Sequence, residues 1–157
     1  ALSHGRIVTI LSAGDDSAKS FTVTGTDVNG DAQTESITGA NADTATGTSY
    51  FLTISGISAV GNPAGNVSAG VNASAADVIF AGRARLRGVG LTSTATAGNI
   101  NFLNTSPVGT SIMKVSSVAS ATATRDLKIP HDGVLFTSGI YIQYTVSTFL
   151  TLTAFHA

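Results

Sequence analysis

The stretch Ile140-Tyr-Ile-Gln-Tyr-Thr-Val-Ser147 decides the fold class of this chain. Ile, Ile, Tyr and Val at every second place alternate with Tyr, Gln, Thr and Ser between them. Successive side chains of a β-strand point to opposite faces of the sheet, so this period of two predicts a half-buried strand. The same alternation recurs over residues 20–24, 66–71 and 126–129.

Further segments match the strand pattern less closely, and turn signals separate several of them. Asn29-Gly30 and Asp132-Gly133 accept the positive φ of tight turns, and residues 61–65 read Gly-Asn-Pro-Ala-Gly. The chain is therefore expected to be all-β, forming an antiparallel β-sandwich or a jelly-roll-like fold. The additional expected strands are residues 6–12, 33–38, 50–55, 81–91, 99–104, 111–116 and 149–155.

The stretch of small residues from Asn72 to Asp77 is the best candidate for a module boundary. It predicts an N-terminal β module over residues 1–75 and a C-terminal sandwich or jelly-roll-like module over residues 76–157. Ser74-Ala-Ala-Asp77 also resembles a helix N-cap, which leaves room for a short helix over residues 75–81.

The composition argues against nucleic acid and anionic membranes as binding partners. Charged residues make up 11% of the chain and the formal net charge is -1, so we expect no general attraction to nucleic acid or to an anionic membrane. We also expect no signal peptide and no membrane span, because no apolar run approaches the length that either requires. The absence of cysteine excludes disulfides and thiolate chemistry.

The candidate metal and catalytic residues have simpler interpretations. Asp27, Asn29 and Asp31 imitate the start of a calcium loop, but Thr38 stands where its bidentate Glu would be required, and a hairpin turn explains them. The three histidines, at positions 4, 131 and 156, are scattered, and no nucleophile motif or phosphate-binding glycine loop is present. We therefore predict no catalytic, cofactor-binding or metal residues, and a protein that is not an enzyme.

Arg83, Arg85 and Arg87 form the densest group of charges in the sequence. They alternate with Ala84 and Leu86, so on a strand the three guanidinium groups share one face. Such a row is either a solvated face that discourages edge-to-edge aggregation or a subunit or capsid interface that binds carboxylates of a neighbour. These arginines are the predicted interface residues.

Several segments resemble β-rich structural proteins of tailed bacteriophages. In the first module these are Phe21-Thr-Val-Thr-Gly-Thr-Asp27, residues 30–39 and residues 48–57. In the second they are Leu86-Arg-Gly-Val-Gly-Leu-Thr92, Ile100-Asn-Phe102 and residues 127–142, in an order similar to small β-sandwich proteins of phage heads and tails, including capsid decoration (cement) proteins.

The resemblance implies a structural virion protein on the capsid surface, most simply a decoration protein that stabilises the head shell. Its implied partners are the major capsid protein and copies of itself, as a homotrimer, with no cofactor, nucleic acid or membrane. The alternatives are another virion component, in the tail, fibre or head-to-tail region, or a carbohydrate-binding adhesin module.

Overall fold

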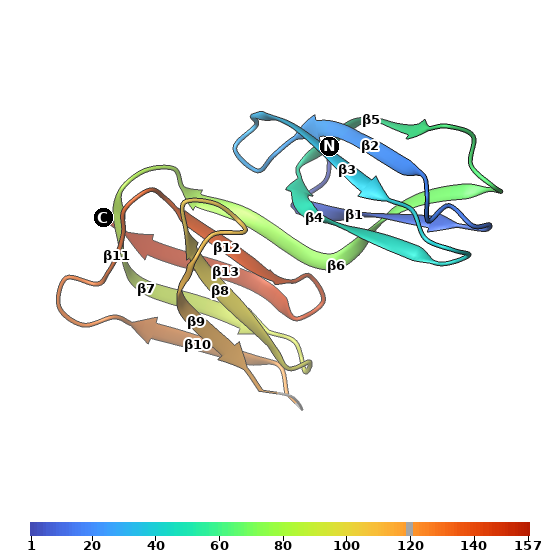
Figure 1. Cartoon of the computed structure of the whole chain (residues 1–157). Coiled ribbons are helices and arrows are strands. Elements are labelled where there is room, and N and C mark those ends of the chain that lie inside the picture. Colours follow the sequence, from blue (N-terminus) through green and yellow to red (C-terminus); the bar gives the residue numbers. More distant parts are fainter. Residues whose placement is uncertain (119–120) are drawn as a thin grey trace. The chain divides into compact units, whose positions relative to one another are not determined.

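The computed structural model describes residues 1–118 and 121–157, which form thirteen β-strands and no helix (Figure 1). The strands make three antiparallel sheets, so the prediction of an all-β, sandwich-like fold is confirmed. The chain divides into two compact units, Ala1–Asn72 and Ala73–Ala157.

Unit 1 is a small sandwich of two sheets. One sheet has the strand order β3-β2-β5, and the other has the order β4-β1-β6, with the first part of β6 in this unit. Apolar side chains from both sheets meet in one core that contains Val8, Ile10, Phe21, Val23, Ile37 and Phe51. The strands are β1 (Gly5–Ser12), β2 (Ser20–Thr26), β3 (Ala32–Thr38), β4 (Thr44–Phe51), β5 (Thr53–Val60) and β6 (Val67–Phe80).

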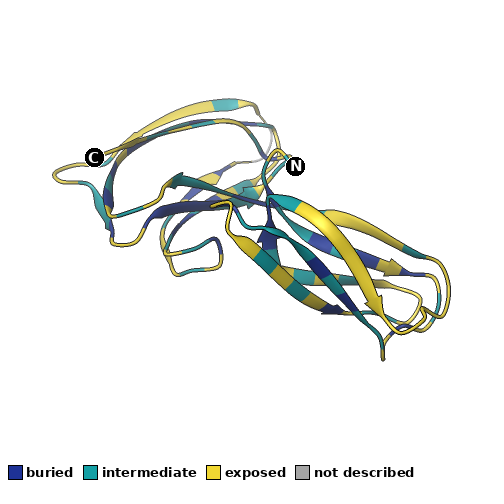
Figure 2. Cartoon of the chain, turned by 90° about the horizontal axis from the view of Figure 1, so that it is seen from above, coloured by how far each residue is buried: buried dark blue, intermediate teal, exposed yellow. Residues whose placement is uncertain are grey.

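Unit 2 repeats this design with a larger core. The rest of β6 continues the strand order through β12, β8 and β9, and the second sheet has β7 at its centre, with β10 and β11 on one side and β13 on the other. Figure 2 shows buried residues alternating with exposed ones along several strands. The strands are β7 (Ala84–Ser93), β8 (Gly98–Asn104), β9 (Ser111–Ser117), β10 (Ala123–Lys128), β11 (Val134–Phe136), β12 (Ile140–Thr145) and β13 (Phe149–His156).

The alternating stretch that predicted the fold is strand β12, which ends at Thr145. Ile140 and Ile142 are buried in the core of unit 2, and Tyr144 packs against that core. Tyr141 is buried as well, although it lies on the opposite face of the strand. β12 lies between β6 and β8 in its sheet, and the packing of one of its faces on the core accounts for the alternation of Ile140, Ile142 and Tyr144 with polar residues.

The short helix that was considered for residues 75–81 is wrong. Residues 75–80 belong to β6, where Ala75 pairs with Tyr144 and Ala76 pairs with Gln143 of β12. Ala75 and Ala76 are fully buried, so pairing within the sheet overrides a weak local capping signal. The division between Asn72 and Ala73 lies inside the same small-residue stretch, in the middle of one strand.

The single strand expected over residues 50–55 is also wrong. The chain turns at Leu52, so that Phe51 ends β4 in one sheet and Thr53 begins β5 in the other. Strand β4 was missed because Thr44-Ala-Thr-Gly-Thr-Ser49 has almost no apolar alternation. The alternation over residues 66–71 placed Val67 and Val71 on the inward side of a strand, which is part of β6. This prediction is confirmed for Val67, which packs on the core of unit 1, and is wrong for Val71, which is exposed.

Candidate functional site

Two of the predicted interface arginines, Arg85 and Arg87, belong to strand β7, and Arg83 immediately precedes it. Ala84 and Leu86 are buried there, Arg83 and Arg87 are exposed, and Arg85 is partly exposed. The strand therefore turns its small and apolar side chains towards the core and the arginines outward, as its alternation requires. The use of this row as an interface stays a prediction.

A β-bulge at Arg87 shapes this face. On β13, Phe155 pairs with Gly88 and the next residue, His156, pairs with Leu86, so Arg87 has no partner in that strand. The extra residue shifts the alternation, and Val89 is buried as Leu86 is. Glycine within a strand often marks a bulge, and Gly88 was the sequence signal for this one.

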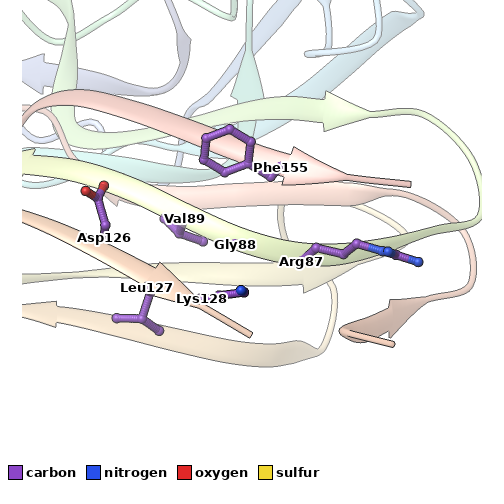
Figure 3. Close-up of a pocket in the computed structure, with 7 residues that line it drawn as sticks. All are labelled: Arg87, Gly88, Val89, Asp126, Leu127, Lys128 and Phe155. Carbon is purple, nitrogen blue, oxygen red and sulfur yellow. The ribbon is translucent and has the colours of Figure 1, made fainter. Parts of the chain in front are cut away.

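A hollow of about 370 Å³ opens beside the bulge (Figure 3). Gly88 has no side chain to fill it, and its cross-strand partners are Lys128 on β10 and Phe155 on β13. Phe155 is 59% exposed at the border. The complete lining is Arg87, Gly88, Val89, Asp126, Leu127, Lys128 and Phe155.

The cations of this face have few partners within the chain. Arg85 donates a hydrogen bond from Nη1 to the backbone oxygen of Asp132, at 3.5 Å. Within residues 1–118 and 121–157, no carboxylate forms an ion pair with Arg83, Arg87 or Lys128. In Figure 3, Asp126 and the guanidinium group of Arg87 lie at opposite ends of the drawn residues. These cations are therefore available to an external anion.

We call Arg83, Arg85, Arg87 and Lys128 the basic face of unit 2. The sequence pattern identified the three arginines but missed Lys128 and the hollow beside it. The pairing of β7 with β10 and β13 brings Lys128 and Phe155 to Gly88 from distant parts of the chain. Local alternation carries no information about which strands become neighbours.

The calcium-like sequence forms a hairpin turn. Asp27 Oδ1 accepts hydrogen bonds from the backbone N–H groups of Asn29, at 2.8 Å, and Asp31, at 2.9 Å. Gly30 has the positive φ that the turn requires, and the turn joins β2 to β3. The Asp27 carboxylate is thus occupied by the local backbone.

The three histidines lie in separate places. His4 precedes β1, His131 occupies a turn with a φ of 57°, and the His156 ring lies 4.9 Å from the ring of Phe80. In the part of the chain that the structure describes, no three His, Cys, Asp or Glu side chains are grouped to hold a metal ion.

The comparisons with known proteins identify no relative of this chain. No family model, curated protein or solved structure matches this chain. Among the described residues, none belongs to a helix long and apolar enough to cross a membrane.

Proposed function

We propose that this chain is a structural protein of a tailed-phage particle, which binds the outside of the head shell as a decoration protein and associates with its own copies as a homotrimer. The observation that supports an assembly function best is the unprotected edge of unit 1. Its partners would be the major capsid protein and further copies of itself, at the capsid surface. No catalytic step is part of this function.

Strand β5 is that edge. It pairs with β2 on one side and ends the strand order β3-β2-β5 on the other. Edge strands of soluble monomers are usually protected by charged residues or proline, and β5 contains neither. Ile54, Ile57 and Val60 are exposed along it. An edge of this kind suits a neighbour that adds a strand or covers the apolar side chains.

Binding to shells tests this proposal directly. Purified protein is mixed with head shells that lack it, and bound protein is measured by co-sedimentation. Saturable binding is expected, and electron microscopy of the decorated shells would locate the added density. Shells that bind nothing at any stage of expansion would exclude the decoration function, and density on the tail of intact particles would select the other virion classes.

A pair of matched variants tests the role of β5. The variant Ser58→Lys/Val60→Lys places two lysines on the free edge strand β5. It is expected to weaken shell binding by about tenfold or more, because a neighbour that covers this edge would bury the lysine charges without a partner. Thr34→Lys/Thr38→Lys adds the same charge to exposed positions of β3 and is expected to leave binding unchanged. Equal binding of both variants would exclude the β5 edge as the contact.

A carbohydrate-binding adhesin module is the second candidate, because Phe155 and Asp126 border the same hollow. An exposed aromatic ring offers an apolar face to the C–H groups of a sugar, and a carboxylate accepts hydrogen bonds from hydroxyl groups. Screening against surface glycans tests it. Glycan binding that is lost in Phe155→Ala would favour this candidate over shell decoration.

A further inference from the structure

The two units carry opposite net charges. Unit 1 contains six carboxylates, from Asp15 to Asp43, and two basic side chains, Arg6 and Lys19, a formal charge of -4. Unit 2 contains six basic side chains and three carboxylates, a formal charge of +3. The net charge of -1 for the whole chain conceals this asymmetry, which gives the molecule an acidic and a basic part.

Three of the six acidic side chains in unit 1 are buried or only partly exposed. Asp16 is buried, Asp27 is held in its turn, and Glu35 accepts hydrogen bonds from the backbone of β4. Asp15, Asp31 and Asp43 are exposed, and two of them, Asp15 and Asp43, lie near the end of β1. The backbone of Asp15 forms an isolated antiparallel β-bridge with that of Asn41. The backbone oxygen of Asp43 accepts a hydrogen bond from the backbone N–H of Ser12.

We call Asp15 and Asp43 the acidic end of unit 1. Hydrogen bonds from the side chain and backbone of Ser17 favour the ionised form of Asp15 and lower its pKa from the ordinary value of an aspartate. An exposed apolar side chain belongs to the same end of the sandwich: Leu11 on β1 pairs with Thr44, the residue that follows Asp43. The acidic end therefore combines charge with apolar surface, as interface centres and rims do.

The basic face of unit 2 has the complementary composition. Two of its four cations, Arg87 and Lys128, line the hollow together with Leu127 and Phe155, which are both exposed. Guanidinium groups form paired hydrogen bonds with carboxylates, and each surface offers the other both an opposite charge and an apolar contact.

We infer that the basic face of unit 2 in one copy binds the acidic end of unit 1 in the next copy, so that copies join head to tail. This inference rests on the proposed assembly function and names the two surfaces of the homotrimer. A contact between two different surfaces closes into a ring when the rotation between copies completes a turn, and a trimer is one such ring. A nucleic acid is the weaker fit, because the -4 charge of unit 1 repels a polyanion.

Two charge reversals test the inference by sedimentation at low salt. Arg83→Glu/Arg87→Glu removes the basic face, and Asp15→Lys/Asp43→Lys removes the acidic end. Each variant alone is expected to be monomeric at concentrations where the parent associates. An equimolar mixture is expected to form 1:1 complexes that stop at two copies, because each partner keeps one working surface.

Matched controls separate this contact from a general effect of charge. Lys114→Glu and Asp31→Lys alter exposed charges elsewhere and are expected to associate as the parent does. Asp15→Asn/Asp43→Asn keeps the oxygens that accept the local hydrogen bonds from Ser17 and Thr44, and is expected to weaken association by about tenfold without changing the fold. High salt should weaken the parent assembly too, because the Debye length falls to about 3 Å at 1 M.

Each result has a defined meaning. A parent chain that stays monomeric at low salt, reversals that associate as the parent does, or a mixture that forms no 1:1 complex would overturn the inference. Binding of a single-stranded oligonucleotide that is lost in Arg83→Glu/Arg87→Glu, without self-association, would assign the basic face to nucleic acid. Shell binding by the parent is measured separately: its loss alone would overturn the proposed decoration function and leave the head-to-tail contact standing.

Discussion

The ring of Phe155 on β13 lies over Gly88, its cross-strand partner on β7: a Cβ atom at residue 88 would be 3.4 Å from Cδ2 of Phe155. The same Cβ atom would be 3.1 Å from the backbone oxygen of Leu127 on β10. The glycine therefore admits an aromatic side chain from one neighbouring strand and the backbone of the other. The ring covers a backbone that would otherwise be open to water.

This relationship predicts a measurable contribution of Phe155 to stability. Phe155→Ala is expected to lower the free energy of unfolding by about 0.5–1 kcal/mol, the range of a good cross-strand pair. Leu150→Ala is the control, because Leu150 belongs to the same strand and is 63% exposed, and it should change the value by less than about 0.5 kcal/mol. Urea denaturation measures both. Equal effects would show that the ring does not stabilise β7.

Glu35 predicts a second effect, because it links the two sheets of unit 1. Its Oε1 accepts hydrogen bonds from the backbone N–H of Thr48, at 2.6 Å, and from the Thr48 hydroxyl, at 2.9 Å. Ser49 N–H lies 3.3 Å from both carboxylate oxygens. Glu35→Gln is expected to lower the free energy of unfolding by about 1 kcal/mol. The substitution replaces one carboxylate oxygen by an NH2 group, which is a donor and would face the backbone N–H donors of β4.

Asp31→Asn is the control for Glu35→Gln, because it removes a charge of the same sign from an exposed turn in the same unit. Its midpoint of thermal unfolding should remain at the parent value. A matching loss in both variants would point to net charge as the cause, and not to the bond between β3 and β4.

Asn104 predicts a third effect, at the end of β8 in unit 2. Its Oδ1 accepts hydrogen bonds from the N–H groups of Thr137, at 3.1 Å, and Ser138, at 3.0 Å, while Nδ2 donates to Thr137 Oγ1 at 2.9 Å. Asn104→Ala is expected to lower stability by about 1–2 kcal/mol. Asn104→Asp keeps the acceptor and should lose less. An alanine variant as stable as the parent would contradict this role.

The arginine row predicts a difference between folding and assembly. Replacement of Arg83, Arg85 and Arg87 by serine should leave the midpoint of thermal unfolding almost unchanged, because exposed ion pairs contribute about 0–1 kcal/mol. The same change should weaken self-association or shell binding. Leu86→Ser on the same strand is the contrast: it removes a fully buried side chain and should cost about 2–4 kcal/mol. Unchanged assembly of the triple variant would identify the row as a solvated face.

The sequence predicted the all-β class and the inward side of β12 because both depend on neighbouring residues alone. It also predicted the burial of Ala84 and Leu86. It did not predict the turn at Leu52, since apolar residues continue through that turn without punctuation. Nor did it predict that Lys128 and Phe155 meet at Gly88, because strand order depends on long-range packing.

Strand β6 carries the chain from unit 1 to unit 2 without a loop, and this affects how proteases meet the molecule. The backbone oxygen of Asn72 accepts a hydrogen bond from Arg6, and that of Ala73 accepts one from Val146. Proteases cleave exposed, unpaired loops in preference to strands held by hydrogen bonds. Limited digestion should therefore spare the junction and begin at loop tips, so that the two units are not released as separate fragments.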